Sequence, residues 1–157
     1  GLDGIVIKGL EEYALITELL GKQIHDLELV LDSNLYTLNQ EAKYFWNEHG
    51  ITRFTSSLEL NYKELKAIDL MDSDMIVYGH ITLMVSAQCL RNSTVGCIKD
   101  KNSGKYFEEN HSYYLMKDTK QNSFYVKRHC KYCYNTIYNG KALNLLNNMN
   151  EIKKLKN

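Results

Sequence analysis

From Gly1 to His80 the chain repeats a strand, a polar turn and an amphipathic helix three times, and a fourth apolar run then restarts the pattern. Lys8, Asp32, Ser57 and Gly79 mark the ends of the four runs and the turns after them, and the steps between these markers are nearly equal. Steps of this length suit compact βα units, because each helix returns the chain to the start of a parallel neighbouring strand. The sequence therefore predicts an α/β fold of about four βα units.

The predicted strands are almost continuously apolar, which indicates a parallel sheet with helices on both faces. They cover Leu2–Lys8, Leu27–Leu31, Ile51–Thr55 and Met75–Tyr78. Two architectures accommodate such a sheet: an open doubly wound sheet and a (β/α)8 barrel, of which four units would make half.

Local signals mark the helices between these strands. Thr37 and Gln40 have the spacing of a capping box, in which each side chain accepts a hydrogen bond from the other residue's backbone amide, and Asn61 and Glu64 repeat that spacing. Gly50 is expected to end the helix that begins near Thr37, because glycine readily adopts the left-handed conformation found just past a helix.

After the fourth strand the pattern changes. Asp100–Gly104 predicts a turn, and the alternation in Tyr113–Lys117 and Ser123–Lys127 predicts the two strands of a β-hairpin. Gly140–Met149 has the spacing of a short helix. We expect a single domain with βα repeats in residues 1–89, the cysteine-containing hairpin and helix in residues 90–150 and a frayed tail in residues 151–157.

Charge and hydropathy exclude some classes of protein. The 19 Lys and Arg residues balance 19 Asp and Glu residues, so no whole-chain field draws the protein onto nucleic acid or an anionic membrane. No apolar stretch reaches the roughly 18 to 20 residues of a membrane helix, and no secretory signal is present. We expect a soluble cytoplasmic protein. The abundance of Asn, Lys, Ile and Tyr, without proline, is typical of an AT-rich bacterial genome.

The chain begins Gly1-Leu2-Asp3-Gly4 and passes directly into an apolar run, as a strand cut from a longer protein would. We therefore expect a fragment that has the remainder of its own chain as a partner and that can be inactive alone. Half a barrel also leaves two strand edges and apolar surface uncovered, so self-association is expected, most simply as a homodimer.

Polar residues follow the predicted strands and define a strand-end rim of Asp32, Asn34, Ser57, Glu59 and His80. Ligands of parallel α/β sheets bind at the carboxyl ends of the strands. Glu59 is the candidate general base and His80 the candidate general acid, while the other three residues are candidates for substrate binding. The alternative is that these side chains serve as turn and cap residues and that His80 belongs to the core.

The chemistry of the four cysteines is the most specific signal in the chain. Cys89 and Cys97 form one widely spaced pair, and Cys130 and Cys133, far along the sequence, form a second pair in a Cys-x2-Cys arrangement. The short gap of the second pair lets both thiolates face one ion, and four thiolates suit either tetrahedral zinc or an iron–sulfur cluster. Two disulfides and four buried cysteines without a metal are the alternatives, and His129 is a conceivable substitute ligand.

Several stretches resemble the U32 peptidase family, the collagenase-like proteases. They are Ser57–Leu60, Val77–Cys89 with Cys97, Leu115–Asp118, Phe124–Val126 with Cys130, and Asn135–Asn139. Together they span most of the chain. The family's signature is loosened here to Met84–Cys89, and the last two cysteines are closely paired.

The resemblance implies a TIM-like barrel, of which this chain would be the later part, and a peptidase activity. Related proteins with four cysteines are iron–sulfur proteins that hydroxylate RNA bases or quinone precursors without oxygen, so peptide and RNA both remain candidate substrates. The resemblance carries the ligand role onto Cys89, Cys97, Cys130 and Cys133. A third hypothesis is a non-catalytic scaffold domain that zinc stabilises and that docks on the rest of its chain.

Overall fold

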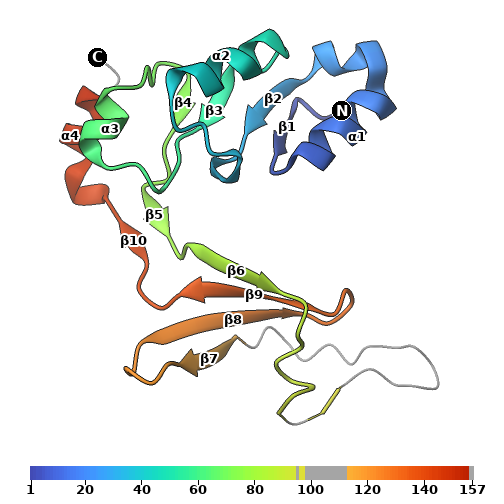
Figure 1. The fold of residues 1–157 in the computed structure, drawn as a ribbon, viewed down its shortest axis with the longest axis vertical. Helices are drawn as coiled ribbons and strands as arrows, with labels where there is room; N and C mark the ends of the chain where they lie inside the picture. Colours follow the sequence, from blue (N-terminus) through green and yellow to red (C-terminus); the bar gives the residue numbers. More distant parts are fainter. Residues whose placement is uncertain (95, 98–112, 156–157) are drawn as a thin grey trace. The chain divides into compact units, whose positions relative to one another are not determined.

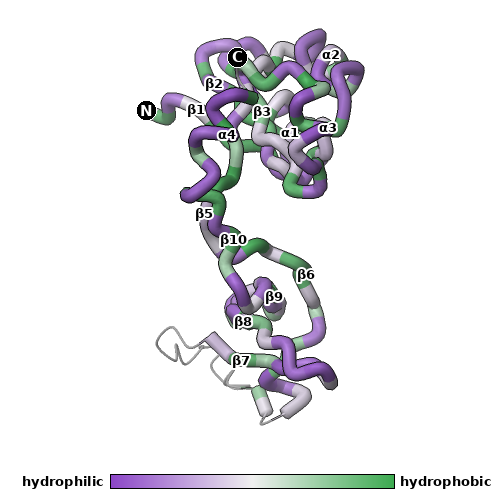
Figure 2. Tube along the Cα trace, turned by 90° about the vertical axis from the view of Figure 1, so that its left-hand side faces the viewer, coloured by the Kyte–Doolittle hydropathy of each residue, from purple (hydrophilic) through white to green (hydrophobic). Residues whose placement is uncertain are grey.

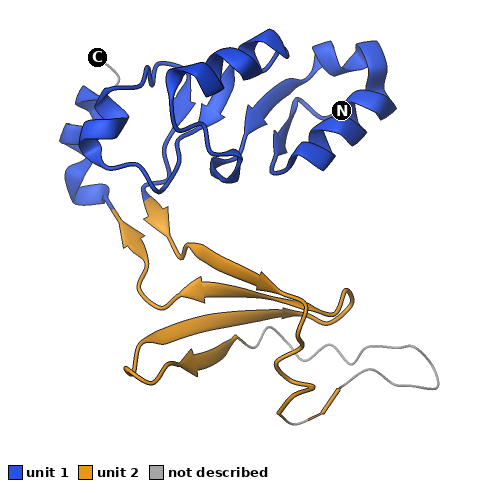
Figure 3. Ribbon diagram, in the orientation of Figure 1, with its two compact units in different colours: residues 1–77, 145–157 blue, residues 78–144 orange. Residues whose placement is uncertain are grey.

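The computed structural model describes residues 1–94, 96–97 and 113–155, and the chain forms two compact units (Figures 1 and 3). Unit 1 contains Gly1–Val77 and Leu145–Asn157, and unit 2 contains Tyr78–Asn144. This division differs from the expected boundary after residue 89, and the expected turn at Asp100–Gly104 lies outside the described residues.

Unit 1 contains the parallel sheet that the repeat predicted. Its order is β1 (Gly4–Ile7), β2 (Glu28–Leu31), β3 (Arg53–Thr55) and β4 (Ser73–Asp74), and all neighbours run parallel. The helices are α1 (Leu10–Leu20), α2 (Gln40–Glu48), α3 (Tyr62–Lys66) and α4 (Met149–Lys154), with the short 3-10 turns η1 (Gly21–Asp26), η2 (Ser33–Leu35) and η3 (Leu146–Asn148). The mixed α/β class is therefore confirmed.

One face of this sheet carries the core of unit 1. Alternate strand residues point to the same side, so Ile7 of β1 and Leu31 of β2, which are register partners, are both fully buried. Helix α2 contributes Trp46, whose ring meets Tyr13 of α1 edge to face at 5.4 Å. The other buried members of this cluster are Leu29, Ile51 and Phe54.

The opposite face of the sheet is open to solvent in the described part of unit 1, which corrects the expectation of helices on both faces. Val6 of β1 is 51% exposed there. Arg53 of β3 pairs with Glu28 of β2 at 2.8 Å and with Asp74 of β4 at 3.1 Å. Hydrogen bonds from the guanidinium to Glu28 and then Asp74 raise the pKa of Arg53 above its ordinary value.

One of the two predicted capping boxes is present at the start of a helix. The Asn61–Glu64 capping box is confirmed, because Asn61 Oδ1 accepts from the Glu64 amide at 3.2 Å and Glu64 Oε2 accepts from the Asn61 amide at 2.8 Å. The Thr37–Gln40 box is wrong. Asn39 caps α2 instead, accepting from the Ala42 amide at 2.9 Å, while Thr37 is buried ahead of it.

The fourth strand is not the apolar run Met75–Tyr78. The strand is instead the polar dipeptide Ser73–Asp74. It pairs with β3 through backbone hydrogen bonds from the Phe54 amide to the Asp72 carbonyl and from the Ser56 amide to the Asp74 carbonyl. Parallel pairing uses main-chain groups, so a very short strand of polar residues can close this edge. The apolar run that follows leads out of unit 1.

Unit 2 is built from antiparallel strands. β5 (Tyr78–Gly79) pairs with β10 (Leu143–Asn144), and a four-stranded sheet has the order β6 (Thr82–Ser86), β9 (Tyr134–Asn139), β8 (Ser123–His129), β7 (Tyr114–Lys117). The predicted β7–β8 hairpin is confirmed. In its turn, Asp118 accepts hydrogen bonds from Asn122 and from the amide of Lys120, and the Asn122 bonds are the main reason that its pKa is lowered.

The predicted helix at Gly140–Met149 is wrong. That stretch contains β10 and η3, and α4 begins only at Met149. Leu155, in the expected tail, is buried with Leu65 and Leu70 in a second cluster of unit 1. Within the described ranges, no helix has the length and apolar character needed to cross a membrane.

Candidate functional site

The first two cysteines lie on the segment that leaves β6. The carbonyl of Cys89 accepts hydrogen bonds from the amide and the hydroxyl of Ser93, at 3.2 and 3.3 Å. The Gly96 amide donates to the Arg91 carbonyl at 3.0 Å, and Arg91 Nε donates to the Gly96 carbonyl at 3.1 Å. Gly96 has a φ of 97°, which favours glycine. This closed loop is followed directly by Cys97.

The other two cysteines occupy the turn between β8 and β9. The turn follows the last register pair, His129 with Tyr134, and is closed by a bond from the Tyr132 amide to the His129 carbonyl at 3.0 Å. Cys133 adopts a left-handed φ of 58°, and its thiol contacts the Cys130 carbonyl at 3.8 Å. The short hairpin turn therefore holds both thiols at one end of the sheet.

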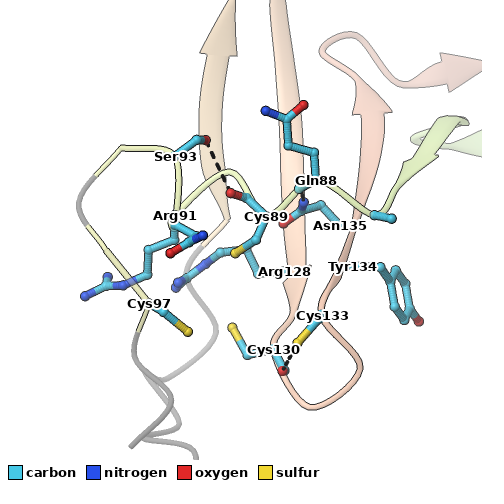
Figure 4. A pocket seen from close by; sticks show the side chains of 12 residues that line it. Gln88, Cys89, Arg91, Ser93, Cys97, Arg128, Cys130, Cys133, Tyr134 and Asn135 are labelled. Carbon is cyan, nitrogen blue, oxygen red and sulfur yellow. Dashed lines mark hydrogen bonds between the residues drawn. The ribbon is translucent and has the colours of Figure 1, made fainter. Parts of the chain in front are cut away.

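All four cysteines line one cavity of 510 Å³, and Figure 4 shows their sulfur atoms around the same space. Cys89 and Cys130 are half-buried, and all four side chains are thiols in the structure. Arg128 and Asn135 of the neighbouring strands also line the cavity. Asn135 is 2% exposed, its amide nitrogen donates to the Gln88 carbonyl, and its Oδ1 has no partner among the described residues.

The donor chemistry of this cavity suits a metal, but its geometry is open. Among the described residues, no three Cys, His, Asp or Glu side chains are arranged to hold a metal ion. A tetrahedral thiolate site has metal–sulfur distances of about 2.3 Å, so the thiols must close in around an ion to form one. The two cysteine segments are a loop and a hairpin turn, which are the parts of a β unit best able to make that movement.

His129 is not placed to substitute for a cysteine. Its Nε2 lies 3.1 Å from Thr136 Oγ1, and its ring stacks on Tyr134 at 4.3 Å. Burial and the nearby Lys127 lower the pKa of His129. Because successive residues of a strand point to opposite faces, His129 faces away from Arg128 and the cavity.

Four of the five strand-end residues follow β2 and β3, which are parallel neighbours. Asp32 Oδ1 accepts from the amide of Asn34 at 3.0 Å and from its side chain at 2.7 Å. Ser57 Oγ accepts from the amide of Glu59 at 3.3 Å, and the Glu59 side chain is exposed. Asp32, Asn34 and Ser57 therefore form hydrogen bonds within the turns that carry them.

His80 does not follow a strand of the parallel sheet. It belongs to unit 2, where it follows the antiparallel β5, and its Nδ1 lies 2.8 Å from the Asn139 carbonyl. Its ring is exposed and meets Tyr125 edge to face at 5.1 Å. The mistaken fourth strand is the reason that sequence reasoning assigned His80 to the rim.

Sequence reasoning also missed a recess of 340 Å³ lined by aromatic rings, namely His80, Tyr113, Tyr125 and Tyr138. Tyr125 of β8 and Tyr138 of β9 are register partners. The sequence contained a signal for this recess, because side chains alternate between the two faces of a strand and the Ser123–His129 strand therefore places Tyr125, Lys127 and His129 on one face.

Comparisons with known proteins agree with the resemblance in the sequence. The family model of peptidase family U32 matches residues 2–156. Neither the curated proteins nor the solved structures gave a match.

Proposed function

Because the chain belongs to peptidase family U32, we propose that it is part of a peptidase-type protein whose unit 2 binds one metal centre. The ligands are the thiolates of Cys89, Cys97, Cys130 and Cys133, and the metal is tetrahedral zinc or the iron of an iron–sulfur cluster. One observation carries the proposal: two cysteine pairs that are far apart in the sequence line the same cavity.

The four cysteines would fasten the loop after β6 to the β8–β9 turn. Four thiolates carry more negative charge than the metal neutralises, and the guanidinium of Arg128, which lines the cavity, supplies nearby positive charge. Zinc in a closed four-thiolate site acts as a structural staple, whereas an iron–sulfur cluster would also supply electron transfer.

The identity of the metal separates three functions. Zinc favours the peptidase or a non-catalytic scaffold domain, and an iron–sulfur cluster favours an oxygen-independent hydroxylase of RNA bases or quinone precursors. Protein purified without oxygen and analysed by visible absorption distinguishes these outcomes, because iron–sulfur clusters are coloured and zinc is not.

Metal content and a cysteine variant test the site. We expect about one zinc ion or one cluster per chain, and Cys130→Ser should lose it because the variant keeps only three thiolates. Asn92→Ala is the matched control, since it removes an exposed polar side chain from the same cavity and no thiol. Absence of zinc and iron from protein prepared under reducing conditions, together with four titratable thiols, would rule the site out.

The proposal extends to the architecture of the longer protein, in which the unit 1 sheet forms about half of a TIM-like barrel. The support is the one-sided packing of unit 1. A doubly wound sheet has helices on both faces, whereas the strands of a barrel have helices only on the outer face. The solvent-accessible face with Arg53, Glu28 and Asp74 would then face the barrel interior.

Peptide hydrolysis in this proposal uses the strand-end residues of unit 1. Glu59 is the general base, with Asp32, Asn34 and Ser57 on the substrate side, and His80 has no role in it because it follows a strand of unit 2. Glu59→Gln should lower the hydrolysis of a gelatin substrate about a hundredfold, a typical acid–base contribution. Metal content and melting temperature should stay constant. Glu48→Gln, an exposed carboxylate on α2, is the control, and full activity in Glu59→Gln would exclude this assignment.

A further inference from the structure

The balanced charge of the chain hides a strong separation between its two units. Unit 2 has ten Lys and Arg residues and four Asp and Glu residues, a formal charge of +6, whereas unit 1 has nine and fifteen, a formal charge of −6. The described residues of unit 2 alone contain seven basic residues and one acidic residue, Asp118. Unit 2 therefore attracts polyanions although the whole chain is neutral.

One face of the unit 2 sheet combines this charge with aromatic rings. On β8, Tyr125, Lys127 and His129 point to one side, and their register partners on β9 are Tyr138, Thr136 and Tyr134. We name these six residues the aromatic sheet face. Two aromatic pairs are thus separated by an exposed lysine, and they lie about 13 Å apart along the strand.

The rings at the two ends are arranged differently. At one end, His80 meets Tyr125 at 5.1 Å and 82°, and Tyr113 meets Tyr138 at 6.5 Å and 65°, so the rings stand at steep angles around the 340 Å³ recess. At the other end, His129 lies almost flat on Tyr134, at 4.3 Å and 16°. Tyr125 is 37% exposed and Tyr113 is 56% exposed, so a ligand can reach the recess.

The cysteine cavity lies on the other side of the same sheet. Val126, Arg128 and Asn135 alternate with the residues of the aromatic sheet face, and Arg128 and Asn135 line the cavity. Arg128 also lies over the ring of Tyr114, at 4.4 Å. Tyr134, at the turn end of the aromatic sheet face, also lines the cavity, whereas Tyr125, Lys127 and Tyr138 do not. The end of this face that carries the aromatic recess is therefore a separate surface from the cysteine cavity.

Charge decides what this face recognises. An aromatic recess can hold a quaternary ammonium ion, but the positive charge of unit 2 opposes a cation. An acidic peptide would match the charge without using the rings. Bases stack on aromatic side chains while phosphates pair with lysine, and open antiparallel sheets carry such rings in RNA-binding modules. We propose that the aromatic sheet face binds single-stranded nucleic acid, with bases against Tyr125 and Tyr138 and phosphates beside Lys127.

Fluorescence anisotropy of the full chain with a labelled oligouridine of about 12 nucleotides tests this proposal, since such a length spans a typical single-strand site. Binding should weaken steeply between about 50 and 200 mM salt. Tyr125→Ala should weaken it about tenfold, the loss expected for one stacking ring. Tyr125→Phe, which keeps the ring, should bind like the parent. Lys127→Gln should reduce the slope of the logarithm of the binding constant against the logarithm of the salt concentration by about one.

Tyr44→Ala is the matched control, because it removes an exposed tyrosine from α2 in unit 1. It should leave binding unchanged, and metal content should be the same in all these variants, which separates this test from that of the cysteine site. Three results would overturn the proposal: no binding at low salt, equal affinity in Tyr125→Phe, Tyr125→Ala and the parent, or displacement of the oligouridine by polyglutamate of equal length as effectively as by unlabelled oligouridine.

Discussion

Lys43 is a lysine of α2 that is buried beneath the start of β4. Its ammonium group donates hydrogen bonds to the Asp69 carbonyl and, at 3.3 Å, to Ser73 Oγ, and it lies 4.9 Å from the centre of the Phe54 ring. Burial lowers the pKa of Lys43, while Asp69 and Asp72 act in the opposite direction. The residue ties α2 to the amino end of the fourth strand, which is the end of a βα fold associated with stability.

Lys43→Ala should lower the free energy of unfolding by about 2 kcal/mol or more, because it removes a buried side chain and leaves its hydrogen-bond acceptors unpaired. Lys66→Ala, at an exposed position of α3, should change stability little. Urea denaturation measures both. Equal midpoints for the two variants would mean that Lys43 does not anchor the strand.

Prediction from sequence succeeded at residues whose partners are local. The Asn61–Glu64 box lies within one helical turn, so its pattern is complete in the sequence. The burial of Lys43 depends on Asp69 and Ser73, which are far along the chain, and no local pattern records it. The four cysteines were predicted to lie together because few other roles suit a closely spaced pair. His80 was wrongly placed on the rim because the apolar run before it was wrongly predicted to be a strand of the parallel sheet.

Strand pairing in unit 2 depends on one close backbone approach. Gly140 follows β9, and a Cβ atom at this position would lie 1.9 Å from the carbonyl oxygen of Ser123 at the start of β8. Backbone atoms cannot move aside as the end of a flexible side chain can. The β8–β9 pair therefore requires glycine here, for space rather than for an unusual φ.

Gly140→Ala should lower the stability of the β8–β9 pair by about 2 kcal/mol, a typical cost of forcing an extra atom into a packed site. Hydrogen exchange should then accelerate at amides of β8 and β9 while β1 and β2 remain protected. Gly9→Ala is the control, because its Cβ would meet only the flexible end of Glu11 at 3.1 Å. Unchanged protection in β8 and β9 would show that the strands can shift to admit the methyl group.

The element pattern was predicted best where a helix separates two strands. β1 to β3 and their helices match the first two steps of the repeat, because each unit buries its apolar residues against the next. The fourth unit departed from the pattern because main-chain pairing selected Ser73–Asp74 over the more apolar Met75–Tyr78. Hydropathy alone cannot distinguish strands that pair in a parallel sheet from strands that begin an antiparallel one.

Apolar surface on both units is consistent with a partner. Leu10, Leu15 and Leu19 of α1 are 61%, 55% and 72% exposed, and β1 and β4 are the edge strands of the parallel sheet. In unit 2, β6 is hydrophobic along its middle in Figure 2, and Leu83, Met84 and Val85 are each more than half exposed. Soluble proteins usually cover such edges and patches.

The chain should therefore self-associate as a homodimer when it is purified without other proteins. Sedimentation velocity at roughly tens of micromolar should detect a dimer, a range in which moderately stable complexes form. A Leu15→Lys and Leu19→Lys double variant should dissociate it by placing like charges in the interface, whereas Leu38→Lys, outside α1, should not. A parent chain that stays monomeric would show that these surfaces do not pair with each other.

The proposed metal centre in unit 2 is most directly tested by X-ray absorption spectroscopy of the purified chain. The absorption edge identifies zinc or iron, and the fine structure reports the ligands. Four sulfur neighbours at about 2.3 Å are predicted, the distance of thiolates on zinc. Cys130→Ser should reduce either the sulfur count or the metal content. A metal surrounded by nitrogen and oxygen at about 2.0 to 2.1 Å, or a chain without zinc or iron, would contradict binding by Cys89, Cys97, Cys130 and Cys133.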